Sequence, residues 1–325
     1  MTGRVIHTGQ AIVDLVMTVP ALPQPGTDVF ATSHQITAGG GFNVMAAARR
    51  DGADVVYLGG HGTGRFGDIV RQALADEQIT VTQNATLDLD TGFSVAIVDS
   101  DAERTFVSTV GAEGRLTTED LNAAGVRPGD VVYVSGYSLY HPNNAMVIAD
   151  WSGRLPKSVA TVLDPSPMVR QIPDAIIRTV VTHSTVITAN ESEARALAAR
   201  FIPKSTATTV EDLTHALADA LTTTVIVRAN RAGAWLAESG GPAIEIPPFD
   251  VAPIDTNGAG DAHTGILCAG LAAERDLLES VHRANAGAAI AVTRRGPATS
   301  PTASEIDEIA SARPRRNVPP TGRRR

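Results

Sequence analysis

The stretch Asp255-Thr256-Asn257-Gly258-Ala259-Gly260-Asp261 decides how this chain is interpreted. A glycine-rich turn leads directly into the apolar helical pattern of residues 261–273. The first backbone N–H groups of a helix have no intrahelical acceptor, and they lie at the positive end of the helix dipole. Gly258 and Gly260 have no Cβ, so a phosphate group can approach the backbone closely. The stretch therefore predicts an anion-binding site at a helix start.

Asp261 falls in the first turn of that helix, beside the expected anion. A carboxylate next to a phosphate is electrostatically unfavourable unless the reaction uses it. One function is to take a proton from an incoming hydroxyl group during phosphoryl transfer. The alternative is that Asp261 only caps the helix. This stretch alone leaves both interpretations open.

The composition indicates a large α/β protein. The chain has 325 residues, of which 43% are hydrophobic and 4% aromatic, and its net charge is −8. A negative charge argues against non-specific binding to nucleic acid. The N-terminus has no signal-peptide core, and no apolar run is long enough to span a membrane. Cys268 is the only cysteine and lies in an apolar helical pattern, so we expect a buried thiol and a cytoplasmic protein.

The fold class follows from the alternation of short β-branched runs with alanine-rich helical patterns. Such alternation predicts a mostly parallel sheet covered by helices on both faces. The expected strands are 55–58, 131–134, 159–163, 186–188 and 225–227, and the expected helices are 44–50, 68–77, 191–199, 212–221, 261–273 and 277–292.

Two segments interrupt this alternation. Residues 11–37 and 93–111 are typical of β ribbons and have no helix between them to cover a face. We expect a small β lid that stands off the main domain. A second copy of the chain would cover its exposed face, which predicts a homodimer through the lid. The folded domain is expected to span 1–312, and the basic, proline-rich segment 313–325 is expected to be a mobile tail.

A second glycine cluster, Gly39-Gly40-Gly41-Phe42-Asn43, precedes the helix at 44–50. Backbone amides at a helix start can bind ligand hydroxyl groups, and the Asn43 amide offers both a donor and an acceptor. Asp14, near the start of the first ribbon, is an acceptor that would suit a pair of hydroxyl groups. A simple turn role for Asp14 remains the alternative.

Gly62-Thr63-Gly64-Arg65-Phe66-Gly67 matches the dinucleotide-binding fingerprint by its letters. It lies after a helix and outside the first strand–helix unit, and no acidic residue ends a second strand at the proper distance. We therefore do not expect a nicotinamide or flavin site. The chain also lacks the lysine motif of P-loop enzymes.

Asn190 and Glu193 follow the expected strand at 186–188. Ligands of α/β proteins bind at the carboxyl ends of such strands. Oxygen ligands of this kind would suit Mg²⁺, directly or through water. A capping box, with Asn190 as N-cap and Glu193 three residues later, explains the same residues and is compatible with that role.

Taken together, these motifs resemble the ribokinase (PfkB-type) family of carbohydrate and nucleoside kinases over about residues 5–310. The match consists of several motifs in the family's order. They are Gly39 to Asp68 for the N-terminal signature, Gly111-Ala112 to Leu121 after the second ribbon, Asn190–Glu193, Asp255–Asp261 for the C-terminal signature, and Thr293-Arg294-Arg295-Gly296-Pro297 with Ser300.

The resemblance implies a three-layer α/β/α fold with a β lid, and ATP- and Mg²⁺-dependent transfer of a γ-phosphoryl group to a hydroxymethyl group. It implies that Asp261 is the general base. The other roles it implies are an anion hole from Asn257, Gly258, Ala259 and Gly260, magnesium and phosphate binding by Asn190 and Glu193, a substrate grip by Asp14, Gly40, Gly41 and Asn43, an adenine pocket lined by Asn285, and a monovalent-cation site for K⁺ at Asp255 and Ser300.

Two departures from the family pattern bear on the substrate and on the nucleotide. Phe42 stands beside the glycine pair, where it would either stack on a nucleoside base or pack in the core. Arg228-Ala229-Asn230 stands where the family normally has Thr-Leu-Gly, and Arg228 would either pair with an ATP phosphate or lie at the surface. A sugar kinase is the principal hypothesis. The alternatives are a nucleoside kinase of the same fold and a non-catalytic sugar or nucleotide sensor.

Overall fold

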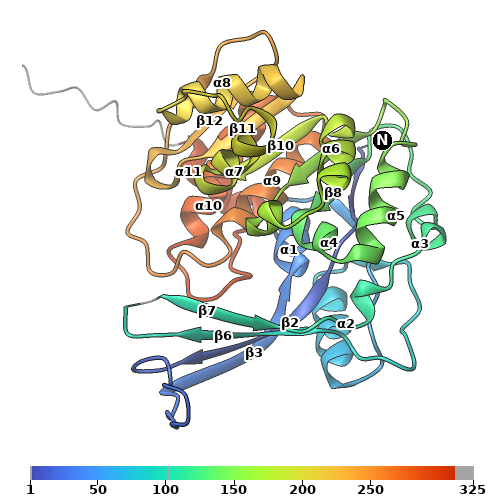
Figure 1. The fold of residues 1–325 in the computed structure, drawn as a ribbon, viewed down its shortest axis with the longest axis vertical. Helices are drawn as coiled ribbons and strands as arrows, with labels where there is room; N and C mark the ends of the chain where they lie inside the picture. Colours follow the sequence, from blue (N-terminus) through green and yellow to red (C-terminus); the bar gives the residue numbers. More distant parts are fainter. Residues whose placement is uncertain (1, 102, 312–325) are drawn as a thin grey trace, which may run out of the picture.

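The structure, a computed structural model, describes residues 2–101 and 103–311, so the predicted tail at 313–325 lies outside the described residues. A central nine-stranded sheet has the order β13-β12-β11-β10-β9-β8-β1-β4-β5. Its strands run in the same direction except for β12, which pairs antiparallel with β11 on one side and with the edge strand β13 on the other. A separate four-stranded sheet, β3-β2-β6-β7, lies below the main domain in Figure 1.

The described strands are β1 (Arg4–His7), β2 (Ala11–Thr18), β3 (Ser33–Gly40), β4 (Asp54–Tyr57), β5 (Thr80–Val81), β6 (Phe93–Val98), β7 (Arg104–Ser108), β8 (Val131–Ser135), β9 (Ala160–Asp164), β10 (Val186–Asn190), β11 (Thr224–Arg228), β12 (Ala234–Ala237) and β13 (Ile244–Ile246). The helices are α1 (Gly41–Arg50), α2 (Arg65–Asp76), α3 (Thr118–Asn122), α4 (Gly136–Tyr140), α5 (Pro142–Ser152), α6 (Asp174–His183), α7 (Glu191–Phe201), α8 (Val210–Leu221), α9 (Ala259–Ala272), α10 (Leu277–Ala291) and α11 (Ala303–Ser311).

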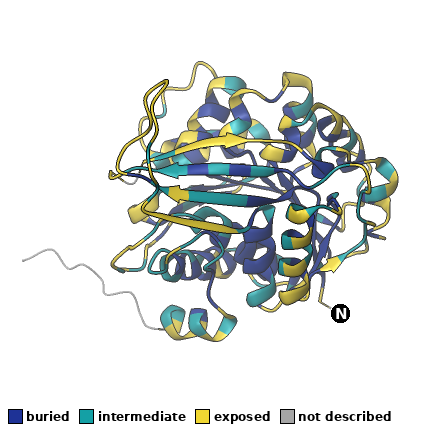
Figure 2. Ribbon diagram, turned by 90° about the horizontal axis from the view of Figure 1, so that it is seen from below, coloured by how far each residue is buried: buried dark blue, intermediate teal, exposed yellow. Residues whose placement is uncertain are grey.

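The central sheet is the middle of three layers. Successive residues of a strand point to opposite faces, so each face of the sheet presents side chains that helices cover. One face packs against α1, α2, α9, α10 and α11, and the other packs against α3 to α8. In Figure 2 the inner parts of the main domain, behind the yellow and teal strands of the separate four-stranded sheet, are dark blue. The predicted α/β/α fold class is confirmed. Neighbouring residues that face opposite layers are Val5 and Ile6 in β1, Val55 and Val56 in β4, and Val131 and Val132 in β8.

The four-stranded sheet is the predicted β lid. Its second ribbon is fixed at both ends by the buried Glu113 carboxylate, which accepts hydrogen bonds from Gly92 N (2.9 Å) and Gly111 N (2.8 Å). Burial raises the pKa of Glu113, while the two amide donors oppose that shift. The lid is therefore held to the main domain at the base of β6 and β7.

The two faces of the lid differ in character. Asp14 pairs across the sheet with Thr37 and Ser94, whereas the next residue, Leu15, pairs with Ile36 and Val95. Because side chains alternate along a strand, Asp14 and Leu15 lie on opposite faces. The base of the apolar face is covered by α2, where Phe66 stacks on Phe93 at 4.9 Å. Farther out, the same face leaves Met17, Ile36 and Val107 exposed.

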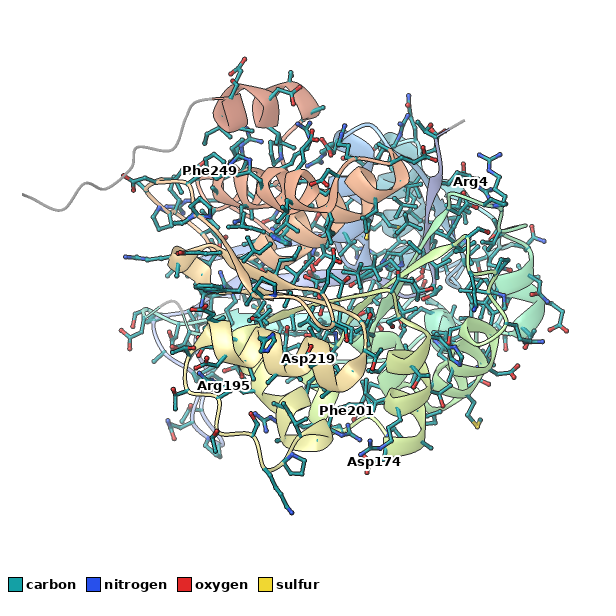
Figure 3. The ribbon with its side chains drawn as sticks, turned by 90° about the horizontal axis from the view of Figure 1, so that it is seen from above. Arg4, Asp174, Arg195, Phe201, Asp219 and Phe249 are labelled. Carbon is teal, nitrogen blue, oxygen red and sulfur yellow. The ribbon has the colours of Figure 1, made fainter. Side chains whose placement is uncertain are left out.

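At the opposite end of the main domain, Arg4 binds the fully buried Asp130 carboxylate at 2.6 Å and fixes the start of β1 (Figure 3). The predicted elements agree with the observed ones. Each predicted strand and helix overlaps an observed strand or helix, and Cys268 is buried as expected. No helix within residues 2–101 and 103–311 is long and apolar enough to cross a membrane.

Candidate active site

The predicted site residues gather at the carboxyl ends of the parallel strands, on the side that the lid covers. Strands β9, β10 and β11 end at Asp164, Asn190 and Arg228, and helix α9 begins nearby at Ala259. Ligands of open α/β sheets bind at this edge. The fold therefore brings together residues that lie far apart in the sequence.

The turn before α9 has the geometry of an anion-binding loop. Gly258 has φ +74°, and a Cβ at this position would lie 1.8 Å from the carbonyl oxygen of Pro297, so only glycine fits. No described side chain caps the start of α9, whereas Asn190 caps α7 and Asp276 caps α10. The interpretation of Asp261 as a mere helix cap is therefore wrong. The first-turn amides of α9 suit an anion.

Asp261 lies next to the predicted substrate turn. Its Oδ2 accepts a hydrogen bond from Nδ2 of Asn43 at 3.0 Å, which joins α9 to α1. The pKa of Asp261 is raised to about 6, mainly by burial and also by the charges of Asp164 and Asp14, while Asn43 and Arg228 oppose the shift. A carboxylate with this pKa is ionised at neutral pH and is still basic enough to accept a proton.

Asp14 points toward the same space from the lid. A Cβ added to Gly39 would lie 2.0 Å from Oδ2 of Asp14, so the carboxylate lies directly over this glycine. Burial raises the pKa of Asp14 to about 6. No described residue donates a hydrogen bond to this carboxylate. The turn interpretation does not explain this half-buried acceptor inside β2, whereas ligand hydroxyl groups would satisfy it.

Gly40 and Gly41 shape the local backbone to a greater extent than the sequence predicts. Gly40 has φ +60°, a conformation that favours glycine. The amide of Gly41 donates to the carbonyl of Gln10 at 2.7 Å, and a Cβ at Gly41 would lie 2.3 Å from the ring of His7. The Gly41 amide is thus already used inside the protein. Gly41 allows α1 to start against β1 and so sets the position of Asn43.

Asn190 and Glu193 form a complete capping box: Glu193 N donates to Oδ1 of Asn190 (2.9 Å), and Asn190 N donates to Oε2 of Glu193 (2.8 Å). Burial and the charge of Asp164 raise the pKa of Glu193 to about 7, and the charge of Arg228 lowers it. Among the described residues, no group of three or more acidic, histidine or cysteine side chains is arranged to hold a metal. One carboxylate with phosphate oxygens from a ligand still suits Mg²⁺.

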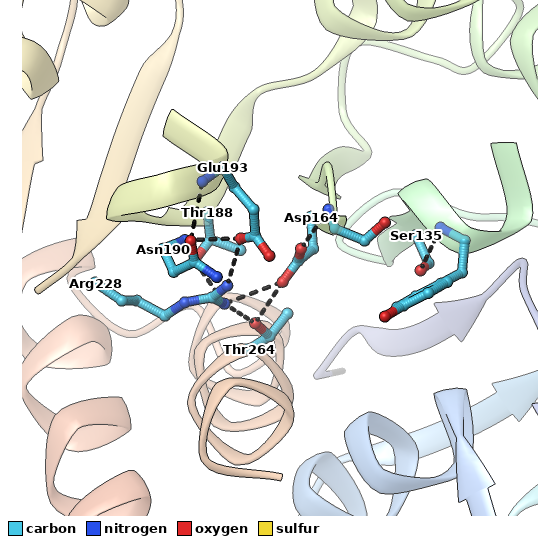
Figure 4. A network of polar contacts seen from close by, with 9 residues as sticks. Ser135, Asp164, Thr188, Asn190, Glu193, Arg228 and Thr264 are labelled. Carbon is cyan, nitrogen blue, oxygen red and sulfur yellow. Dashed lines mark hydrogen bonds and ion pairs between the residues drawn. The ribbon is translucent and has the colours of Figure 1, made fainter. Parts of the chain in front are cut away.

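Arg228 lies in the middle of this network (Figure 4), so its interpretation as a surface arginine is wrong. Its Nη1 donates to Asp164 (3.0 Å) and Thr264 (2.7 Å), and its Nη2 donates to Glu193 (3.3 Å). A Cβ on Gly260 would lie 3.7 Å from Cζ of Arg228. The guanidinium group is therefore fixed beside the first turn of α9, within reach of an anion bound there.

Three further residues occupy places that limit their roles. Phe42 is only 5% exposed and packs in the core, so it offers no face for stacking on a base. Asn285 uses its amide to hold the carbonyls of Ile246 and Pro247 (3.2 Å each), which shapes the loop after β13. Ser300 is buried, and its Oγ has no partner among the described residues.

The glycine motif at 62–67 is not a dinucleotide site. The Asp90 carboxylate accepts hydrogen bonds from the amides of Phe66 (3.0 Å) and Gly67 (2.8 Å) at the start of α2. A pyrophosphate would have to displace this carboxylate from the amides it would bind. The fingerprint in this chain therefore serves to cap a helix.

Sequence reasoning missed three residues of the site. Asp164 ends a predicted strand, so the rule that selected Asn190 would have selected it too. Tyr137 follows another predicted strand and is 43% exposed; burial, followed by the charges of Asp261 and Asp164, raises its pKa to about 12. Arg104 in β7 contacts Asp255, and no sequence signal links these two residues.

A family model described as pfkB family carbohydrate kinase matches residues 3–303. An Escherichia coli K12 protein described as an uncharacterized sugar kinase, YegV, is 31% identical over 304 residues, covering 93% of this chain and 92% of that protein.

Solved structures agree in fold. The ribokinase of Arabidopsis thaliana, complexed with ribose and ATP, superposes with a TM-score of 0.79 at 20% identity, covering 96% of this chain and 99% of that one. The nucleoside kinase of Methanocaldococcus jannaschii superposes with a TM-score of 0.76 at 17% identity, covering 96% and 99% of the two chains.

Proposed function

Because the chain belongs to the pfkB family of carbohydrate kinases, we propose that it transfers the γ-phosphoryl group of ATP to a hydroxymethyl group of a sugar. The observation that carries this proposal is the 3.0 Å hydrogen bond between Asn43 and Asp261 beside the uncapped start of α9. This bond joins the Asn43 amide, which can bind sugar hydroxyl groups, to the Asp261 carboxylate, which can accept a proton. Both lie beside the first turn of α9, which can bind an anion.

The substrate end of the site is formed by Asp14, Gly40 and Asn43. The half-buried Asp14 carboxylate accepts two sugar hydroxyl groups as hydrogen-bond donors, which offsets the cost of its partial desolvation. Asn43 holds Asp261 through Nδ2, and its Oδ1, which has no partner among the described residues, accepts a further hydroxyl group. These contacts hold the hydroxymethyl group against the second oxygen of Asp261.

In the chemical step, Asp261 takes the proton of the substrate hydroxyl through Oδ1. The hydroxyl oxygen forms a bond to the γ-phosphorus as the bond to the oxygen bridging the β- and γ-phosphates breaks, leaving ADP. The Asn257 amide already donates to Oδ1 of Asp255 and the Ala259 amide to the carbonyl of Thr256, so the amides of Gly258 and Gly260 are the ones that stabilise the charge on the transferred group. Removing a general base of this kind typically costs about a hundred- to ten-thousandfold in rate.

Arg228 lies next to Gly260 and provides a fixed positive charge for a phosphate oxygen. Asn190, and Glu193 through water, would hold the Mg²⁺ that accompanies ATP, and this ion would supply positive charge against the phosphates. Asn285 shapes the loop after β13, beside which we place the adenine ring.

A nucleoside kinase remains the second candidate because of Tyr137. Its partly exposed ring lies within the electrostatic influence of Asp261 and Asp164. Aromatic rings in such positions stack on bases. The core position of Phe42 removes the other aromatic candidate.

We also propose that two chains pair through their lids. The exposed Met17, Ile36 and Val107 would then be covered by the same residues of the second copy. The molecular mass in solution at micromolar concentration tests this, and a monomer across that range would contradict it.

The proposed function is tested by coupled ADP release with ATP and Mg²⁺ over a panel of pentoses, hexoses and nucleosides. Turnover with a sugar supports the proposal, and turnover with nucleosides alone would replace it by the second candidate. ATP binding without turnover on any member would favour the sensor.

A further inference from the structure

One ion pair connects the lid to the loop that precedes α9. Nη2 of Arg104, the first residue of β7, lies 2.5 Å from Oδ1 of Asp255. The side chains are 26% and 22% exposed. Among the described residues of β6 and β7, this is the one side-chain hydrogen bond that reaches the main domain.

The Asp255 carboxylate connects the anion loop to the turn around Gly296. Its Oδ1 also accepts a hydrogen bond from Asn257 N (2.9 Å), and its Oδ2 accepts one from Gly296 N (3.0 Å). The carboxylate thus ties the anion loop to the turn that contains Pro297, whose carbonyl lies against Gly258. Any cation bound to Asp255 therefore influences the geometry of the anion loop.

The residues present do not fit the monovalent cation that the family resemblance implied at Asp255 and Ser300. The guanidinium group of Arg104 already neutralises the Asp255 carboxylate, so a second cation would be repelled at short range. The carbonyls of Ala298 and Ser300 accept hydrogen bonds from Nη1 of Arg50 at 2.8 and 3.0 Å. The Oγ of Ser300 is left, and a single neutral hydroxyl group provides neither the charge nor the ligand number of a cation site.

We propose that Arg104 takes the place of a monovalent cation at Asp255, so that the lid supplies the positive charge under the anion loop. Without a counterion, the Asp255 carboxylate would repel ATP phosphates at the neighbouring amides. Since Arg104 belongs to the lid, the loop is neutralised only when the lid lies over the site. Arg104 is thus a positioning residue. This inference rests on the proposed phosphoryl transfer.

The proposal has a direct consequence for salt dependence. At constant ionic strength, replacing tetramethylammonium by K⁺ should leave the turnover of the wild-type protein unchanged within about twofold, because no site for the ion is free. A K⁺ activation well above that range would overturn the proposal.

Arg104→Ala should create a need for a cation. We expect kcat to fall about ten- to hundredfold, the usual size of a coupling between two sites. K⁺ or free guanidinium, at concentrations too low to denature the protein, should restore part of this loss, whereas tetramethylammonium should not. Arg104→Lys should retain more activity than Arg104→Ala. A purely structural arginine would show no such rescue, and wild-type turnover in Arg104→Ala would also overturn the proposal.

The matched control is Arg115→Ala. Arg115 also forms an arginine–aspartate pair, with Asp88, but both side chains are more than half exposed. Exposed pairs of this kind contribute little. Its turnover and its salt dependence should match those of the wild-type protein.

A second measurement keeps this inference separate from the proposed function. The melting temperature is recorded with K⁺ and with tetramethylammonium, without substrate. K⁺ should raise it for Arg104→Ala and not for the wild-type protein, and an equal K⁺ effect on both would overturn the inference. If no substrate turns over, the proposed function fails. The comparison of melting temperatures still tests whether Arg104 or a monovalent cation neutralises the Asp255 carboxylate.

Discussion

Replacing Asp261 by asparagine should make the protein more stable at pH 8 and nearly inactive. The ionised carboxylate is disfavoured in the folded protein, because burial raises its pKa from 3.8 to about 6. The substitution removes that charge and keeps an oxygen that can accept the hydrogen bond from Asn43. Loss of activity with a gain of stability is the signature of a group kept for chemistry.

The magnitude follows from the shift. About two pKa units at about 1.4 kcal/mol each give a penalty of about 3 kcal/mol, and water reaching this partly exposed side chain reduces it to about 1–2 kcal/mol. Since the folded-state pKa is the higher one, the penalty is absent below about pH 4 and complete above about pH 6. Asp261→Asn should therefore raise the free energy of unfolding by about 1–2 kcal/mol at pH 8 and by almost nothing at pH 4.

The assay pairs urea unfolding at pH 4 and pH 8 with steady-state turnover at pH 8. We expect turnover to fall about a hundred- to ten-thousandfold. The control is Asp54→Asn, because the Asp54 side chain is 77% exposed and lies away from the site. Unchanged turnover, or a lower unfolding free energy at pH 8 than the wild-type protein has, would refute the reasoning.

Three further predictions follow from the same site. In a pH–rate profile, kcat/KM should fall as the pH drops below about 6, because Asp261 and Asp14 both become protonated there; a flat profile down to pH 5 would count against both roles. Arg228→Ala should lower the urea-unfolding free energy by about 3–5 kcal/mol, since it leaves two buried carboxylates without their partner, and Arg228→Lys should lose less; equal stability of the three proteins would contradict this. Gly258→Ala should weaken ATP binding measured by calorimetry, because φ +74° and the 1.8 Å approach of the Pro297 carbonyl force the loop to move, whereas wild-type affinity would mean that the loop does not hold the phosphates.

Much of the fold could be predicted from the sequence because the central strands are buried on both faces and the helices repeat apolar residues at helical spacing. The antiparallel edge strands β12 and β13 were not predicted. They have only four and three residues, and Glu245 interrupts the apolar pattern of β13. Helices α5 and α6 were missed as well, although α5 has proline at its first position, a common helix-start signal.

The candidate site could be predicted where a local motif carries the function. Asp261, Asn43 and Glu193 each belong to a short motif, and the structure brings them to one edge of the sheet. Ion pairs between residues far apart in the sequence could not be predicted, because no local motif links the two partners. The contact of Arg104 with Asp255 joins residues 151 positions apart, and the contact of Arg228 with Asp164 joins residues 64 apart.

Roles that depend on side-chain direction were the least predictable. Phe42 was open between base stacking and core packing, and only its burial decided for the core. The homodimer, the cytoplasmic location and the domain limits stay predictions.

The most direct test of the central claim is a ³¹P NMR spectrum of the product formed from ATP, Mg²⁺ and the sugar that turns over best in the panel. Transfer to a hydroxymethyl group gives a phosphomonoester whose phosphorus couples to two protons on the adjacent carbon, as well as ADP. We predict this product for the wild-type protein and its absence for Asp261→Asn. A phosphorus coupled to a single proton, or inorganic phosphate as the only new signal, would contradict the account.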